Sequence, residues 1–152
     1  MKKIKLLPAV FAFVAALALT SCNSDDDAAP NPAAGAFVTA TVNGAALNFN
    51  SITTDSDGPL ISAQAVSDDI QHLMQFGMDK DIDPDTYATS TQMMDGKFLR
   101  YMYQGTQIPA EDGTLVITSN DGHWINGTFH FEGMDTEGTM GHVTNGEFHI
   151  YY

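Results

Sequence analysis

Short β-prone runs separated by Asn-Gly and Asp-Gly pairs dominate the sequence from residue 37 to residue 152. Asn, Asp and Gly tolerate the left-handed backbone conformation that tight hairpin turns require. Seven such pairs fall within these 116 residues, and they begin at Asn43, Asp57, Asp95, Asp112, Asp121, Asn126 and Asn145. Turn signals this dense leave little room for long helices, so the sequence predicts many short antiparallel strands joined by hairpins.

The runs between these pairs are rich in Val, Ile, Thr, Phe and Tyr, the residue types that are enriched in strands. We expect strands at Phe37–Val42, Ala45–Phe49, Leu60–Val66, Gln71–Met78, Lys97–Tyr103, Thr114–Thr118, Trp124–Phe131, Gly138–Val143 and Gly146–Tyr152. A single weak helix candidate lies at Ser90–Asp95. Eight or nine strands at this spacing predict an all-β fold, either a single antiparallel β-sandwich or a partly closed barrel.

Alternation of apolar and polar residues assigns faces to the late strands. Phe129 and Phe131 are expected to face the core, and His130 between them is expected to face outward. By the same alternation, Phe148 faces the core and His149 faces outward. The two histidines are therefore expected on the outer surface of the domain.

The N-terminal 21 residues have the pattern of an export signal. A basic segment (1–5) precedes an apolar stretch of 14 residues (6–19), which is too short to span a bilayer. It ends in Leu19-Thr20-Ser21-Cys22, which resembles the lipobox of bacterial lipoproteins, where the Cys receives the acyl chains. Two or three chains anchor a protein stably, so we expect attachment to a membrane through Cys22. The alternative is an ordinary secretory signal with a Cys at the cleavage site by chance.

The segment 22–35 predicts a tether between the anchor and a β domain at 36–152. Three Asp residues at 25–27 follow the lipidated Cys, and an Ala/Pro-rich stretch without periodicity follows them. The Ser-Asp-Asp-Asp run resembles the surface-export signal of Bacteroidetes-type lipoproteins. That resemblance implies the outer membrane with the domain facing the medium, whereas a plain acidic tether would imply only the envelope.

The negative charge of the exported part argues against nucleic acid as a partner. The chain holds 19 Asp and Glu against 6 Lys and Arg. Three of the six bases lie in the leader, so the remainder carries three bases against 19 acids, a formal net charge of −16. Such a surface repels phosphate backbones, so nucleic acid is not expected as a partner.

The C-terminal half contains two Phe-bearing motifs after a Gly-led strand that ends in Ile117-Thr118. They are Ile-Asn-Gly-Thr-Phe-His-Phe at 125–131 and Val-Thr-Asn-Gly-Glu-Phe at 143–148. With Thr41-Val42-Asn43-Gly44 between the first two expected strands, they resemble a group of small Bacteroidetes-type lipoproteins of unknown function. The resemblance covers most of the domain and implies a β-rich fold, and it assigns no catalytic or binding residue.

Two groups of residues are candidate metal ligands. Alternate carboxylates suit Ca²⁺, and they occur at Asp79, Asp81, Asp83 and Asp85. The resemblance to an EF-hand loop stops there, because Pro stands at the sixth position and Ser at the twelfth. A solvated acidic loop is the alternative. His130 and His149 would bind Zn²⁺ or Cu²⁺ if their strands placed them side by side, with Glu132 or Glu147 as a third ligand, and scattered surface histidines are the alternative.

Aromatic residues around the only Arg are candidates for binding an organic ligand. Tyr101 and Tyr103 could stack on sugar rings if both are exposed, with Arg100 binding a hydroxyl or carboxylate. The alternative places the two tyrosines in the core. Trp124 is likewise either a second platform or a core residue.

No catalytic motif is present: the chain lacks Gly-x-Ser-x-Gly, His-Glu-x-x-His and a phosphate-binding loop. We therefore expect a non-enzymatic module without a cofactor that binds an extracellular glycan or protein. Two alternatives stay open, a structural subunit of an envelope assembly and a Ca²⁺-binding module that uses the Asp79–Asp85 cluster.

Overall fold

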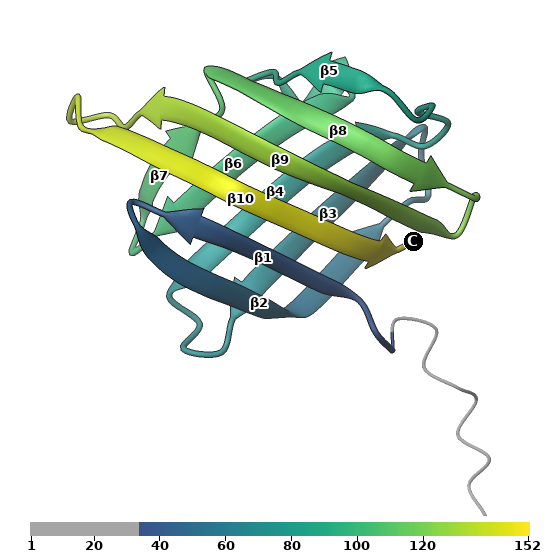
Figure 1. Cartoon of the computed structure of the whole chain (residues 1–152), viewed down its shortest axis with the longest axis horizontal. Helices are drawn as coiled ribbons and strands as arrows, with labels where there is room; N and C mark the ends of the chain where they lie inside the picture. Colours follow the sequence, from purple (N-terminus) through teal and green to yellow (C-terminus); the bar gives the residue numbers. More distant parts are fainter. Residues whose placement is uncertain (1–33) are drawn as a thin grey trace, which may run out of the picture. The chain divides into compact units, whose positions relative to one another are not determined.

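Ten antiparallel strands in one hydrogen-bonded sheet make up the fold (Figure 1). The computed structural model describes residues 34–152. The predicted signal peptide (1–21), the lipidation site Cys22 and all but the last two residues of the predicted tether (22–35) lie outside the described residues. The elements are β1 (Phe37–Val42), β2 (Ala45–Asp55), β3 (Leu60–Ser67), β4 (His72–Asp79), β5 (Thr86–Ala88), η1 (Met93–Asp95), β6 (Lys97–Tyr103), β7 (Thr106–Pro109), β8 (Asp112–Asn120), β9 (Trp124–Met134) and β10 (Met140–Tyr151).

The sheet curls on itself and forms two layers. Its strand order is β5-β8-β9-β10-β1-β2-β3-β4-β6-β7, and the layer with β8, β9, β10 and β1 crosses over the layer with β3, β4 and β6 (Figure 1). At one corner the two layers are joined, because the Ser90 amide, just after the edge strand β5, donates to the Lys97 carbonyl of β6 at 2.9 Å. The predicted fold class, an antiparallel sandwich or partly closed barrel, is confirmed.

Aromatic rings from both layers meet in the core. Phe76 of β4 contacts Phe129 of β9 edge to face, with ring centroids 5.4 Å apart and planes at 87°. It also contacts Phe148 of β10 at 5.4 Å. All three rings are at most 2% exposed, so the inward orientation that alternation predicts for Phe129 and Phe148 is confirmed. Edge-to-face pairs of this kind add to the free energy gained by burial.

The elements differ from the expectation at several points, and β2 runs on to Asp55 rather than ending at Phe49. The sequence does not predict β5 and β7, since strands of three and four residues are too short to show alternation. The expected strands Gly138–Val143 and Gly146–Tyr152 are one strand, β10, with a bulge in its middle. The helix candidate at Ser90–Asp95 contains only the 3-10 turn η1. Among the described residues, no helix is long and apolar enough to cross a membrane.

Three of the Asx-Gly pairs lie inside strands, so the expectation that they form turns is wrong. Gly127 lies opposite Phe148 in the register, Gly146 lies opposite Phe129, and Gly113 faces another Phe of β9. A Cβ added to Gly127 would lie 2.6 Å from Phe148 Cζ, and one added to Gly146 would lie 2.5 Å from Phe129 Cδ2. These glycines are required because each phenyl ring lies across its cross-strand partner.

Candidate functional site

The outward side chains of β9 and β10 form the surface that carries the candidate site. Successive residues of a strand point to opposite faces, and Ile125, Phe129 and Phe131 of β9 are buried. The outward residues of β9 are Trp124, Asn126, Thr128, His130, Glu132 and Met134. His149 of β10 likewise lies between two buried residues. The predicted outward orientation of both histidines is therefore confirmed.

Four half-buried rings gather at one end of this surface, and we call them the aromatic corner: Phe37, Trp124, His149 and Tyr151. The indole of Trp124 stacks on the imidazole of His149, with centroids 4.1 Å apart and planes at 10°. Phe37 of β1 lies 5.9 Å from His149, and Tyr151 meets Trp124 at 5.1 Å and 68°. Rings from three neighbouring strands thus form one continuous patch.

Hydrogen bonds fix the aromatic corner in place. His149 Nδ1 is hydrogen-bonded to the Asn126 side-chain oxygen, and Asn126 Nδ2 donates to Ser119 Oγ at 2.7 Å. At the β8–β9 turn, the Asp121 carboxylate accepts the Trp124 backbone amide at 2.7 Å and the His123 amide at 2.9 Å. These backbone hydrogen bonds lower the pKa of Asp121. The corner is therefore positioned before any ligand arrives.

Trp124 belongs to the outer surface rather than to the core. Of the two roles open to it, the core role is wrong because Ile125 is fully buried and takes the inward position. The indole is half-buried against His149. The outward orientation of Trp124 can be read from the sequence, because Trp124 is six residues from His130 and an even spacing along a strand places both on one face. Phe37 has no such signal, because its place beside His149 follows from the pairing of β1 with β10.

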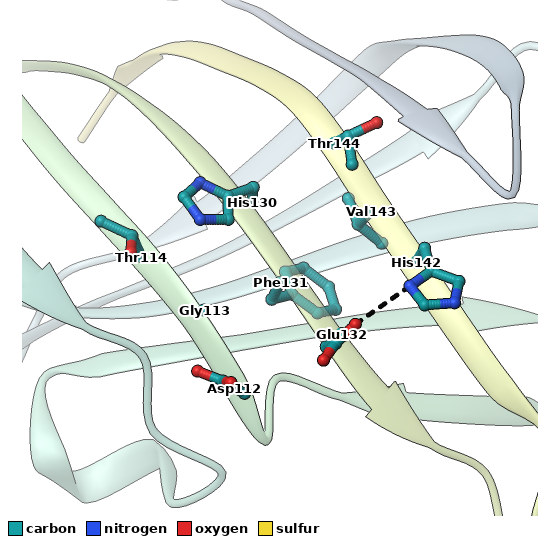
Figure 2. Close-up of a pocket in the computed structure, with 9 residues that line it drawn as sticks. All are labelled: Asp112, Gly113, Thr114, His130, Phe131, Glu132, His142, Val143 and Thr144. Carbon is teal, nitrogen blue, oxygen red and sulfur yellow. Dashed lines mark ion pairs between the residues drawn. The ribbon is translucent and has the colours of Figure 1, made fainter.

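A shallow polar hollow of about 230 Å³ lies at the other end of the same surface (Figure 2). Asp112, Glu132 and His142 form one row across β8, β9 and β10. His142 Nδ1 lies 3.1 Å from Glu132 Oε2, and both side chains are about half exposed. The next row places His130 beside Thr114. The hollow thus offers carboxylate, imidazole and hydroxyl groups to a ligand.

A second hollow, of about 410 Å³, adjoins the first through His130. It is lined by Thr128 on β9 and by Glu147 on β10, which face each other in the register. Between the hollows, β10 bulges at Asn145, whose φ is 51°. The bulge leaves an extra residue of β10 unpaired and bends the strand beside both hollows.

The histidines predicted as a metal pair do not meet. His149 lies opposite Asn126, four residues along β9 from His130, because the hairpin register pairs Met140 with Met134 and runs from there to the strand ends. Within residues 34–152, no three His, Cys, Asp or Glu side chains are placed to hold a metal ion. The geometry therefore gives no support to zinc or copper binding by His130 and His149.

Side chains from elsewhere in the domain donate hydrogen bonds to the backbone carbonyls of the Asp79–Asp85 segment. Asn120 Nδ2 donates to the carbonyls of Lys80 and Ile82, both at 3.1 Å. The Tyr87 hydroxyl donates to the Asp83 carbonyl at 2.9 Å. Carbonyls that could ligate Ca²⁺ are thus hydrogen-bonded already. The carboxylates of Asp79, Asp81, Asp83 and Asp85 form no three-ligand group, so the geometry does not support the calcium hypothesis.

The proposed sugar platform of Arg100, Tyr101 and Tyr103 is split between two faces. Arg100 points outward, where its Nη1 donates to Gln107 Oε1 at 2.7 Å and its Nε to Gln75 Oε1 at 3.0 Å. Tyr101 points inward and is only 4% exposed. Alternation along β6 separates Arg100 from both tyrosines, so the three side chains cannot contact one ligand together.

Tyr101 belongs instead to a polar cluster at the start of β4, which the sequence does not predict. Its hydroxyl oxygen lies 2.5 Å from His72 Nδ1, and Tyr103 stacks on the same imidazole at 4.7 Å. Burial, with smaller effects from Tyr103 and Asp69, raises the pKa of Tyr101 to about 12. The hydroxyl is therefore protonated over the physiological range and serves as a structural hydrogen-bonding group.

Comparisons of the chain with known proteins find no relative. No protein-family model, curated protein or solved structure matches the chain. Function is therefore inferred from the geometry of the described residues and from the sequence.

Proposed function

We propose that this protein is a lipid-anchored lipoprotein of the cell envelope whose β domain is a non-enzymatic binding module. The lipobox ending at Cys22 supports the anchor, because the only thiol of the chain stands where acylation requires it. The acidic run at 25–27 supports display on the outer face of the outer membrane. The ligand is then an extracellular glycan or protein.

The aromatic corner is the observation that carries the binding function. Contact between aromatic rings and water is thermodynamically unfavourable. Covering accessible rings on an outer sheet face with a partner therefore lowers the free energy. Trp124 and Tyr151 also combine a large apolar ring with a polar group, a combination enriched at binding surfaces. The hydrogen bonds around Asn126 and Asp121 hold the rings in one arrangement, so binding costs little ordering of side chains.

Fluorescence tests this proposal directly, because Trp124 is the only tryptophan of the chain. In the full-length protein in mild detergent, we expect acrylamide to quench Trp124 much more strongly than a buried indole. Soluble envelope polysaccharides or secreted proteins that bind should reduce the quenching. The variant Gln64→Ala, on the outer face of β3 in the opposite layer, is the matched control and should leave the quenching unchanged. Quenching as weak as that of a buried indole in the free protein would contradict the proposal.

The anchor is tested separately by Cys22→Ala. We expect the variant to lose incorporation of labelled palmitate and to move from the membrane fraction to the soluble fraction, because no acyl chain can then be attached. Protease added to intact cells should digest the wild-type domain if it faces the medium. Labelling that persists in Cys22→Ala would show that the anchor lies elsewhere.

A further inference from the structure

The two polar hollows and the aromatic corner lie along a single strand, β9. The first hollow contains Glu132 and His130, and the second contains His130 and Thr128. Asn126 and Trp124 continue the same outward row into the corner. We call this row, from Glu132 to Trp124, the β9 track. The eight steps from Trp124 to Glu132, at roughly 3.3 Å each, give it a length of about 26 Å.

Resting on the binding function proposed above, we propose that the β9 track binds a linear, electrically neutral polysaccharide along its length. A pyranose ring has an apolar C–H face that stacks on aromatic rings and a rim of hydroxyls that both donate and accept hydrogen bonds. Trp124 offers the aromatic surface at one end. His130, Thr128 and the Glu132 carboxylate offer donors and acceptors along the rest.

The charges of the track favour a neutral polymer over an anionic one. The two hollows contain the carboxylates of Asp112, Glu132 and Glu147, and their lining in the described chain includes no Lys or Arg. A sulfated or uronic-acid polymer, or an anionic lipid surface, would face these carboxylates without a compensating cation. Neutral hydroxyls instead donate hydrogen bonds to carboxylates, and bonds to an ionised acceptor are stronger than neutral ones.

The track also fits a chain of sugars better than the face of a folded protein. The centre of a protein interface is poor in charged residues and becomes fully desolvated. Here Glu147 of β10 flanks the middle of the track opposite Thr128, and His130 is exposed nearby. A narrow polymer leaves such groups in contact with water while it occupies the hollows. A site of this length predicts that affinity rises with the number of sugar units.

Affinity electrophoresis of the full-length protein in mild detergent tests the proposal. The gels contain a linear β-1,4-glucomannan, a linear mixed-linkage β-glucan or a linear α-1,4-glucan, and dextran sulfate is the anionic comparison. We expect retardation by at least one neutral polymer and none by dextran sulfate. Trp124→Ala at one end of the track and His130→Ala in its other half should each weaken binding about fivefold. Trp124→Phe should restore part of it, and Gln64→Ala should bind as the wild type does.

A second measurement reports on length. Fluorescence titration with oligosaccharides of the retarding polymer should give tighter binding for six sugar units than for two. Equal affinities for six and for two sugar units would overturn the track and leave the corner as a binding site. The same conclusion would follow if Trp124→Ala lost binding while His130→Ala bound as the wild type does. Mobility unchanged in all three neutral gels, or retardation by dextran sulfate, would overturn the neutral polysaccharide. Acrylamide quenching of the free protein, which needs no ligand, judges the binding function independently.

Discussion

The aromatic rings on the two faces of β9 and β10 lie in different environments. On the inner face, Phe129 and Phe148 are fully buried against Phe76 of the other layer. On the outer face, Trp124 and His149 stack on each other and stay half-buried. Inner rings have glycine partners across the strand, whereas outer rings have hydrogen-bonded polar neighbours. The comparison teaches that one pair of strands supplies stability on its inner face and, on the function proposed above, recognition on its outer face, and that mutations one residue apart should separate the two.

The largest expected difference is between the adjacent residues Phe129 and His130. Phe129→Ala removes a ring that is 2% exposed and should lower the free energy of unfolding by about 3–5 kcal/mol. His130→Ala removes an exposed side chain and should change it by less than about 0.5 kcal/mol. Chemical denaturation of both variants measures the difference. Similar losses in the two would show that the outer face also stabilises the fold, and the comparison would fail.

A methyl group added on the inner face tests the glycine–phenylalanine pairs. In Gly127→Ala the new Cβ would lie 2.1 Å from the Val116 backbone oxygen and 2.6 Å from Phe148 Cζ. Because backbone must move, we expect a loss of about 3 kcal/mol. Gly58→Ala is the matched control, since its Cβ would meet nothing within 4 Å, and it should stay within about 0.5 kcal/mol of the wild type. Equal melting temperatures for the two variants would contradict the role given to Gly127.

Tyr101 carries a polar group on the inward face of β6, and its titration sharpens the comparison. Its pKa is raised to about 12, from 10.0 for a free side chain, mainly because burial disfavours the phenolate. Because this pKa is raised, the contribution of Tyr101 to the free energy of unfolding is complete below pH 10 and is lost as the pH rises towards 12. The loss amounts to roughly 2 kcal/mol. Denaturation from pH 9 to 12 should show this fall in the wild type relative to Tyr101→Phe, and parallel curves would refute it.

Most of the fold follows from local signals in the sequence. Asn43-Gly44 forms the predicted hairpin turn with φ of 48° and 86°, and alternation assigns Phe129 and Phe148 correctly. The same dipeptide signal fails at Asn126-Gly127, because a glycine opposite a Phe looks identical in sequence to a glycine in a turn. Only the register, a long-range property, distinguishes the two cases.

The site is less predictable because it is assembled across strands. Alternation alone separates Arg100 from Tyr101, and it places Trp124 on the face of His130. It cannot place Phe37 beside His149, since 112 positions separate them in the chain and the β1–β10 pairing brings them together. The predicted pairing of His130 with His149 fails because the β9–β10 hairpin pairs Met134 with Met140, and this register places His149 opposite Asn126.

The smallest expected effect is that of calcium on the acidic loop outside both faces. If Asp79–Asp85 bound Ca²⁺, a millimolar site would stabilise the protein by about 0.4 kcal/mol in 1 mM Ca²⁺, and a micromolar site by about 4 kcal/mol.

Asn120 and Tyr87 already hydrogen-bond the loop carbonyls, so a cation would have to displace protein donors before it could coordinate. We therefore expect melting temperatures of the full-length protein in 1 mM Ca²⁺ and in EDTA to agree within a degree. Magnesium at the same concentration controls for ionic strength. A rise of several degrees with Ca²⁺ alone would give an exposed acidic segment a stabilising role, and stability would then no longer be confined to the inner face.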